Sequence, residues 1–212
     1  MRDVHKMTNR RQLLTGTAGL AAAAMLGAQP LHAQADLKTE SPLGDVWIGS
    51  PDAKVTIIEY ASLTCGHCAN FHANTWPELK AKYIDTGKVR FTMREFPLDP
   101  LATAGFMLSR CNGNDKYVPM TEMLLKQQKA WAFTDKPVDA LASLAKQAGY
   151  TQQSFEACLK RQDIYDAITQ VKDRGTKSGV DATPTFFING QKRAGALSID
   201  EFDKILQPLL GG

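Results

Sequence analysis

The chain has 212 residues, 43% of them hydrophobic, which is enough for about one globular domain with a buried core. The formal net charge of +3 comes from the first 35 residues, which hold four Lys/Arg and one Asp, so residues 36–212 carry 21 basic and 21 acidic side chains. This balance argues against binding to nucleic acids or to anionic membrane surfaces.

Residues 1–35 have the pattern of an export signal. The segment Asn9–Leu14 contains paired arginines typical of twin-arginine signals, and Gln12–Ala35 has no charged side chain. Ala33-Gln34-Ala35 supplies small residues for cleavage, so we expect a mature chain that starts at Asp36 and works outside the cytoplasm. An ordinary secretory signal is an alternative. A membrane anchor is another, although Gln29-Pro30 interrupts the apolar stretch.

The first half of the mature chain predicts a βαβ unit. A short strand is expected at Val46–Ile48, and the nearly continuous apolar run Val55–Ala61 predicts a strand covered on both faces. A helix is expected from Cys65 to about Tyr83, with a kink at Pro77. Apolar and polar residues alternate over Val89–Arg94, which predicts a strand with one face in water.

Residues 99–179 predict a block of helices. Apolar residues repeat at helical spacing along this block, and glycines stand at plausible helix ends. Two of the four cysteines, Cys111 and Cys158, fall on apolar faces of these helices. In an exported protein we expect them to form a structural disulfide, and two free core cysteines are the alternative.

The C-terminal part predicts a hairpin and a final helix. A strand is expected at Thr185–Ile188, and Asn189-Gly190 is a strong signal for a tight turn into a strand over Gln191–Gly195. The segment Ser198–Glu201 is a capping box for an amphipathic last helix. The order of elements is therefore βαβ, a helical block, then ββα.

Cys65-Gly66-His67-Cys68 follows the first buried strand and opens the first helix. Two intervening residues let both sulfurs share one helical turn, so they can form and reopen a disulfide. Cys65, at the positive end of the helix, is expected to be the exposed attacking thiolate, with His67 as a positive or hydrogen-bonding neighbour. Cys68 is expected to be the less exposed resolving thiol. A purely structural disulfide and a zinc site formed by Cys65, Cys68 and His72 are the alternatives.

The dithiol motif, the element order and Thr183-Pro184 before the third strand together resemble the DsbA-like thiol-disulfide oxidoreductases. The resemblance implies an α/β thioredoxin-like fold (βαβ-ββα) made of residues 36–98 and 180–212, with residues 99–179 as an inserted helical subdomain. Gly66 departs from the family, where proline is common at that place. The motif Cys-Gly-His-Cys also occurs in protein disulfide isomerase.

The resemblance also implies roles for individual residues. Pro184 matches the family's cis-proline beside the cysteine pair, which exposes the backbone of Thr183 to an extended substrate; a trans proline that starts a strand is the alternative. Glu59 matches a buried acid thought to carry protons for the buried cysteine, and an exposed carboxylate at the strand is the alternative. Some family members have a second disulfide, as expected here for Cys111 and Cys158.

The activity implied is that of a monomeric periplasmic oxidase, which transfers the Cys65–Cys68 disulfide to reduced exported proteins through a mixed disulfide on Cys65. By resemblance, a DsbB-like membrane protein that passes electrons to quinone would reoxidise it. No organic cofactor or metal is expected, because the dithiol is the redox group. A disulfide isomerase or reductase with the same site is the nearest alternative, and a non-redox chaperone is a more distant one.

Overall fold

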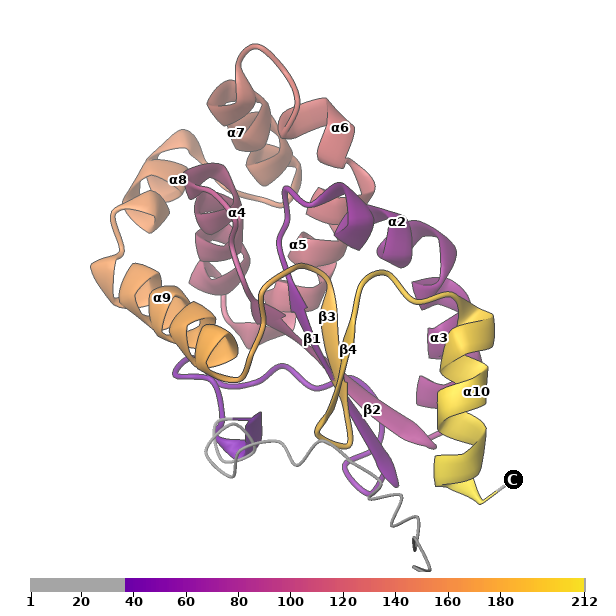
Figure 1. Cartoon of the computed structure of the whole chain (residues 1–212). Coiled ribbons are helices and arrows are strands. Elements are labelled where there is room, and N and C mark those ends of the chain that lie inside the picture. Colours follow the sequence, from indigo (N-terminus) through magenta and orange to yellow (C-terminus); the bar gives the residue numbers. More distant parts are fainter. Residues whose placement is uncertain (1–36, 212) are drawn as a thin grey trace, which may run out of the picture.

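A four-stranded mixed sheet forms the centre of the molecule, in the order β2-β1-β3-β4 (Figure 1). The structure is a computed structural model that describes residues 37–211, so the expected export signal lies outside the described residues. β1 runs parallel to β2 and antiparallel to β3, which is in turn antiparallel to β4. The strands are β1 (Val55–Ala61), β2 (Val89–Glu95), β3 (Thr185–Ile188) and β4 (Gln191–Ala194). The predicted α/β class and the order βαβ-ββα are confirmed.

The helices fall into three groups along the chain. Between β1 and β2 lie α2 (Gly66–Asn74), α3 (Trp76–Leu79) and a π-helical turn (Lys80–Ile84). Between β2 and β3 lie α4 (Pro100–Cys111), α5 (Asn114–Lys126), α6 (Gln128–Trp131), α7 (Pro137–Gln147), α8 (Gln152–Leu159) and α9 (Gln162–Lys177). The last helix is α10 (Ile199–Leu210). Within the described residues, no helix combines the length and the apolar character needed to cross a membrane.

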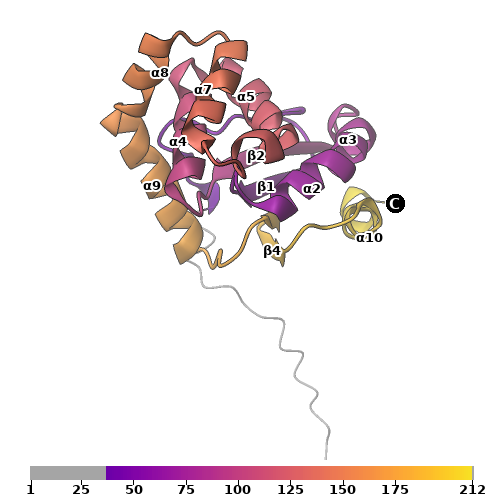
Figure 2. The same ribbon diagram turned by 90° about the horizontal axis from the view of Figure 1, so that it is seen from above.

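Both faces of β1 are buried, as its apolar run predicts. Ile57 faces the larger core, which contains Phe71 of α2 and Phe202 of α10. Tyr60 faces a smaller cluster that includes Val171 of α9. In Figure 2 the strands accordingly lie between α9 on one side and α2 and α3 on the other. Both faces of the sheet are therefore covered along β1, which leads directly into the cysteine motif.

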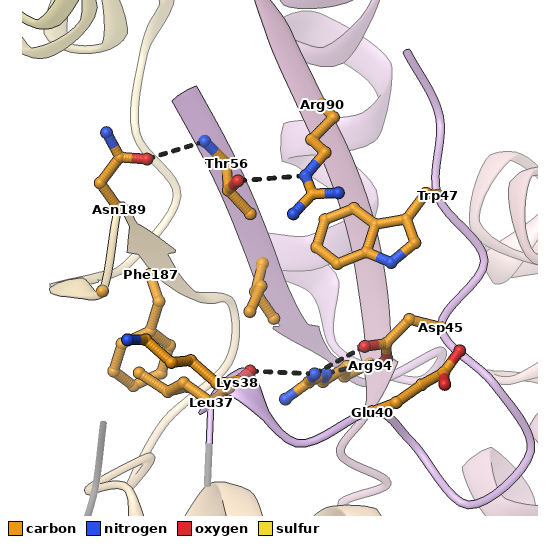
Figure 3. A pocket seen from close by; sticks show the side chains of 12 residues that line it. Leu37, Lys38, Glu40, Asp45, Trp47, Thr56, Arg90, Arg94, Phe187 and Asn189 are labelled. Carbon is orange, nitrogen blue, oxygen red and sulfur yellow. Dashed lines mark hydrogen bonds and ion pairs between the residues drawn. The ribbon is translucent and has the colours of Figure 1, made fainter. Parts of the chain in front are cut away.

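The prediction that β2 has one face in water is wrong. Arg94 is 3% exposed, because the segment that enters from residue 37 folds over this face. Its guanidinium donates to Asp45, to the Tyr60 hydroxyl and to the carbonyl oxygens of Leu37 and Thr39. Figure 3 shows the Arg94–Asp45 part of this network at the edge of a cavity of about 580 Å³. A buried arginine is tolerated here because its donors are paired.

Two local expectations are also corrected. Val46–Ile48 is not a strand, and only Ile48 pairs with the sheet, through a single bridge to Phe91. The helix expected from Cys65 to about Tyr83 is divided at Thr75, next to the expected kink at Pro77, and helical structure continues through α3 to Ile84. Proline has no N–H and clashes with the preceding turn, so α2 ends and α3 begins there.

The C-terminal signals are confirmed. Asn189 and Gly190 both have positive φ (46° and 82°), which is the geometry that a type I′ turn requires. Ser198 and Glu201 form the reciprocal bonds of a capping box at the start of α10. These short-range features connect β3, β4 and α10.

Candidate active site

The cysteine motif lies where β1 ends and α2 begins. Cys65 is the N-cap residue of α2, with extended backbone angles (φ −81°, ψ 118°) and no side-chain cap bond. The unpaired N–H groups of the first helical turn therefore point toward its sulfur. In this structure both Cys65 and Cys68 are free thiols.

The loop before α2 is fixed by side chains from distant elements. Gln128 of α6 is buried, and its Nε2 donates to the carbonyl oxygens of Leu63 (2.8 Å) and Cys65 (2.9 Å). Thr64 Oγ1 donates to Asp99 Oδ2 at 2.5 Å, and Asp99 also caps α4. The helical block therefore positions the cysteine motif.

Cys65 has the properties of a stabilised thiolate. Its pKa is lowered to about 5, first because the Cys68 thiol donates a hydrogen bond to it. Burial opposes this shift, while the Thr183 hydroxyl and the backbone N–H groups of Cys68 and His67 add to it. Cys65 is only 9% exposed, less than expected for an attacking sulfur, because the loop at Thr183 lies over it. His67 and Gly66 are exposed beside it.

Cys68 differs sharply from its partner. It is fully buried, and burial is the largest cause that raises the pKa of its thiol well above the ordinary value. The hydrogen bond to Cys65 and the charge of Glu59 raise it further. The two sulfurs therefore divide into a thiolate near the surface and an interior thiol.

The Thr183–Pro184 peptide bond is cis and lies against Cys65. In the thiol form, Cys65 Sγ donates to the Thr183 carbonyl oxygen at 3.2 Å. When the sulfur is ionised it can instead accept from Thr183 Oγ1, a buried atom with no other partner among the described residues. Thr183 therefore offers the Cys65 sulfur a hydrogen-bond partner in both protonation states.

Glu59 is fully buried in β1, so the alternative of an exposed carboxylate is wrong. Its Oε2 lies 2.9 Å from Nε2 of His72, which is on α2 one turn beyond Cys68. The sequence pattern indicates a role for His72 only as a zinc ligand. In the part of the chain that the structure describes, no group of three or more His, Cys, Asp or Glu side chains could hold a metal ion.

Cys111 and Cys158 form a disulfide between α4 and α8, away from the cysteine motif.

Residues of the motif and of the Thr183-Pro184 loop come together although more than a hundred positions separate them. Gln128 and Thr64 bond to the motif loop or brace it, and no sequence pattern indicates this role for them. Their residue types are common, and only the fold brings them to the site.

A groove of about 1180 Å³ opens beside the motif. It lies between α2 and α3 on one side and α5 and α6 on the other, and it is mainly apolar. Gly66 and His72 are among its lining residues. The cavity in Figure 3 contains none of the motif residues. The groove is therefore the cavity that adjoins the dithiol.

Comparison with known proteins agrees with this geometry. Residues 41–208 match the family model described as thioredoxin. A protein of Rickettsia bellii named as a protein-disulfide oxidoreductase is 34% identical over 148 residues, which cover 69% of this chain and 57% of that protein. A protein of the same name from Rickettsia felis is 33% identical over 172 residues, covering 78% of this chain and 60% of the relative. The chain thus spans about three fifths of these relatives.

A solved structure is also similar. The crystal structure of Wolbachia pipientis alpha-DsbA1 has 32% sequence identity and a TM-score of 0.75. The match covers 83% of this chain and 95% of the Wolbachia protein. The likeness therefore extends over most of both chains.

Proposed function

This chain belongs to the thioredoxin family, among its DsbA-like thiol-disulfide oxidoreductases, and from that membership we propose that it is a protein-disulfide oxidase. The oxidised Cys65–Cys68 pair would accept two electrons from a reduced, exported protein. The observation that carries the proposal is the contrast between the two sulfurs: the pKa of Cys65 is lowered to about 5, while Cys68 is held as a buried thiol.

The chemistry follows from this contrast. A substrate thiolate attacks Cys65 Sγ, the Cys65–Cys68 bond breaks, and Cys68 takes the electron pair and a proton. A second substrate thiolate then attacks the substrate sulfur of the mixed disulfide, and Cys65 leaves as a thiolate. A thiol of low pKa is a good leaving group, so the second step is favoured. The substrate gains a disulfide and the protein keeps two electrons.

The lowered pKa also favours the reduced protein. Each pKa unit corresponds to about 1.4 kcal/mol, so a pKa near 5 stabilises the reduced form relative to an ordinary thiol by roughly 3 kcal/mol at pH 7 and by roughly 5 kcal/mol at most, above about pH 8.5. For a two-electron couple, this makes the disulfide about 60 mV more oxidising at pH 7, and about 110 mV more oxidising at most. The direction of electron flow is therefore from substrate to this protein.

We propose further that the protein works in the periplasm as a monomer and is reoxidised by a DsbB-like membrane protein. The export pattern of residues 1–35 supports this location. Since the dithiol is itself the redox group, the proposed reaction requires no organic cofactor or metal. Cys65, Cys68, Pro184, Thr183 and His67 are the residues proposed to contact the reacting sulfurs or the substrate.

An isomerase or reductase is the second candidate, and Gly66 favours it. A Cβ at Gly66 would meet no atom within 4 Å, so the structure does not require glycine there. Proline at the first position of a helix is well tolerated. The choice of residue at position 66 can therefore adjust the potential without changing the fold.

The test is the reduction potential of the Cys65–Cys68 couple, measured by equilibrium with glutathione buffers. An oxidase should have a potential above about −180 mV, the value typical of protein disulfide isomerase. A value near −270 mV, typical of thioredoxin, would contradict the proposal. The variant Cys65→Ser should lose all activity toward a reduced peptide, whereas a chaperone function would survive it.

A further inference from the structure

A buried Glu59–His72 pair lies next to the resolving cysteine. The side chains of Glu59 and His72 are 0% and 6% exposed, and Oε2 and Nε2 are 2.9 Å apart. Glu59 Oε1 and His72 Nδ1 are buried and have no hydrogen-bond partner among the described residues. Each member thus has one atom engaged in the pair and one atom available for another partner.

The pair connects Cys68 with the groove. His72 follows Cys68 by four residues on α2, so the two side chains share a face of the helix. Glu59 acts electrostatically on the Cys68 sulfur. At the other end, His72 lines the groove between α2 and α6. The pair therefore acts on Cys68 at one end and borders the groove at the other.

The remaining charged or titratable groups around this pair come from other elements. Tyr117 of α5 is buried and interacts electrostatically with Glu59. Glu122 of α5 accepts a hydrogen bond from Trp76 Nε1 and lines the groove. Lys80, Lys126 and Lys129 also line the groove. His72 Nε2 is the nitrogen bonded to Glu59, so His72 is the group best placed to pass a proton to it.

We propose that His72 is a positioning residue that holds Glu59 toward Cys68 and carries protons between Glu59 and the groove. This inference rests on the proposed function, because it concerns the protonation of Cys68 during disulfide exchange. The ring's two nitrogens make the transfer possible, since one can take up a proton while the other gives one away.

The proton movements balance over one cycle. At the start the ring carries its hydrogen on Nε2 and donates it to the Glu59 carboxylate. When the Cys65–Cys68 bond breaks, Cys68 Sγ leaves with the electron pair. His72 Nδ1, which is buried at the wall of the groove, then takes up a proton supplied from the groove, the Nε2 proton passes to Glu59, and Glu59 gives it to Cys68 Sγ. Glu59 is again a carboxylate and the ring hydrogen is on Nδ1; reoxidation reverses each transfer.

The test separates the step of Cys65 from the step of Cys68. Reduced protein is mixed with oxidised glutathione, and rapid acid quenching follows first the mixed disulfide on Cys65 and then its resolution by Cys68. In His72→Phe, which keeps an aromatic ring, we expect the resolution step to slow at least tenfold at pH 7 and to become steeply pH-dependent. The pH profile of Cys65 alkylation should not change.

Three further variants provide controls. Asn74→Phe lies on the same helix and lines the same groove, and it should resolve at the rate of the unmodified protein. His72→Gln keeps an N–H donor but cannot carry a proton, so it should be as slow as His72→Phe. The double variant Glu59→Gln, His72→Phe should be no slower than Glu59→Gln alone, because both residues serve one route.

Imidazole offers a direct rescue. Added imidazole should restore resolution in His72→Ala, since the groove beside the ring can admit it. An unchanged resolution rate and pH profile in His72→Phe, full activity in His72→Gln, or multiplicative losses in the double variant would overturn the inference. Failure of the unmodified protein to oxidise a dithiol peptide would instead overturn the proposed function.

Discussion

At the scale of single residues, the two sulfurs of one motif differ because their neighbours differ. Cys65 receives hydrogen bonds from Cys68, Thr183 and backbone N–H groups, and these favour an anion. Cys68 is enclosed by the core and faces the charge of Glu59, which disfavours an anion. The two cysteines stand only three positions apart in the chain, yet Cys65 prefers to be a thiolate and Cys68 prefers to be a thiol.

Gln128 is the residue whose loss should loosen the motif. Gln128→Ala leaves the buried carbonyl oxygen of Leu63 without its donor and leaves that of Cys65 with Ala69 N–H alone, which should cost about 1–3 kcal/mol in the free energy of unfolding. Amide hydrogen exchange over residues 62–66 should accelerate at least tenfold. The neighbouring Gln127→Ala is the matched control, and equal exchange in both variants would disprove a positioning role for Gln128.

At the scale of secondary structure elements, the disulfide joins α4 and α8 within the helical block. It closes a loop with a sequence separation of 47 residues, for which chain entropy predicts a stabilisation of about 4 kcal/mol. One of the two bridged helices, α4, is capped by Asp99, which also accepts the hydrogen bond of Thr64 in the motif loop. Its effect on the active dithiol is therefore indirect.

Removal of this disulfide should lower stability without removing activity. In Cys111→Ala, Cys158→Ala we expect a lower urea midpoint, corresponding to a loss of roughly 2–4 kcal/mol, with oxidation of a dithiol peptide retained. The complementary variant Cys65→Ser, Cys68→Ser should show no free thiol after denaturation without reductant. Two titratable thiols in that variant would show that Cys111 and Cys158 are not bridged in solution.

Elements with local signals were predictable from the sequence, while long-range contacts were not. The apolar run of β1, the turn at Asn189-Gly190 and the cap at Ser198 depend on neighbours in the chain. Alternation along β2 predicts a solvent-exposed face for Arg94, because a pattern within one strand cannot reveal that residues 37–45 cover it. The donor from Gln128 was missed for the same reason: its partner is Leu63, 65 positions away.

At the scale of the whole molecule, ionisation of Cys65 links redox state to stability. The folded pKa of about 5 is below the ordinary value of about 8.5, so the unfolded chain binds more protons between these pH values. The stability of the reduced protein should therefore rise from about pH 5 to about pH 8.5, by roughly 5 kcal/mol at most. The oxidised protein has neither thiol and should lack this dependence.

Cys68 should limit the gain in stability of the reduced protein at high pH. Its folded pKa is raised, so above about pH 8.5 the unfolded chain loses this proton while the folded chain retains it. The reduced protein should accordingly be most stable near pH 8 to 9 and should melt at a higher temperature than the oxidised protein at pH 7. Thermal melts of both forms across pH check this, and equal melting temperatures at pH 7 would contradict a strongly oxidising dithiol.

The rate at which iodoacetamide alkylates Cys65, followed against pH in the reduced protein, tests the central claim most directly. The account predicts a single titration with a midpoint near pH 5, assigned to Cys65 by its absence in Cys65→Ser. A midpoint near 8.5, the value of an ordinary thiol, would contradict the account.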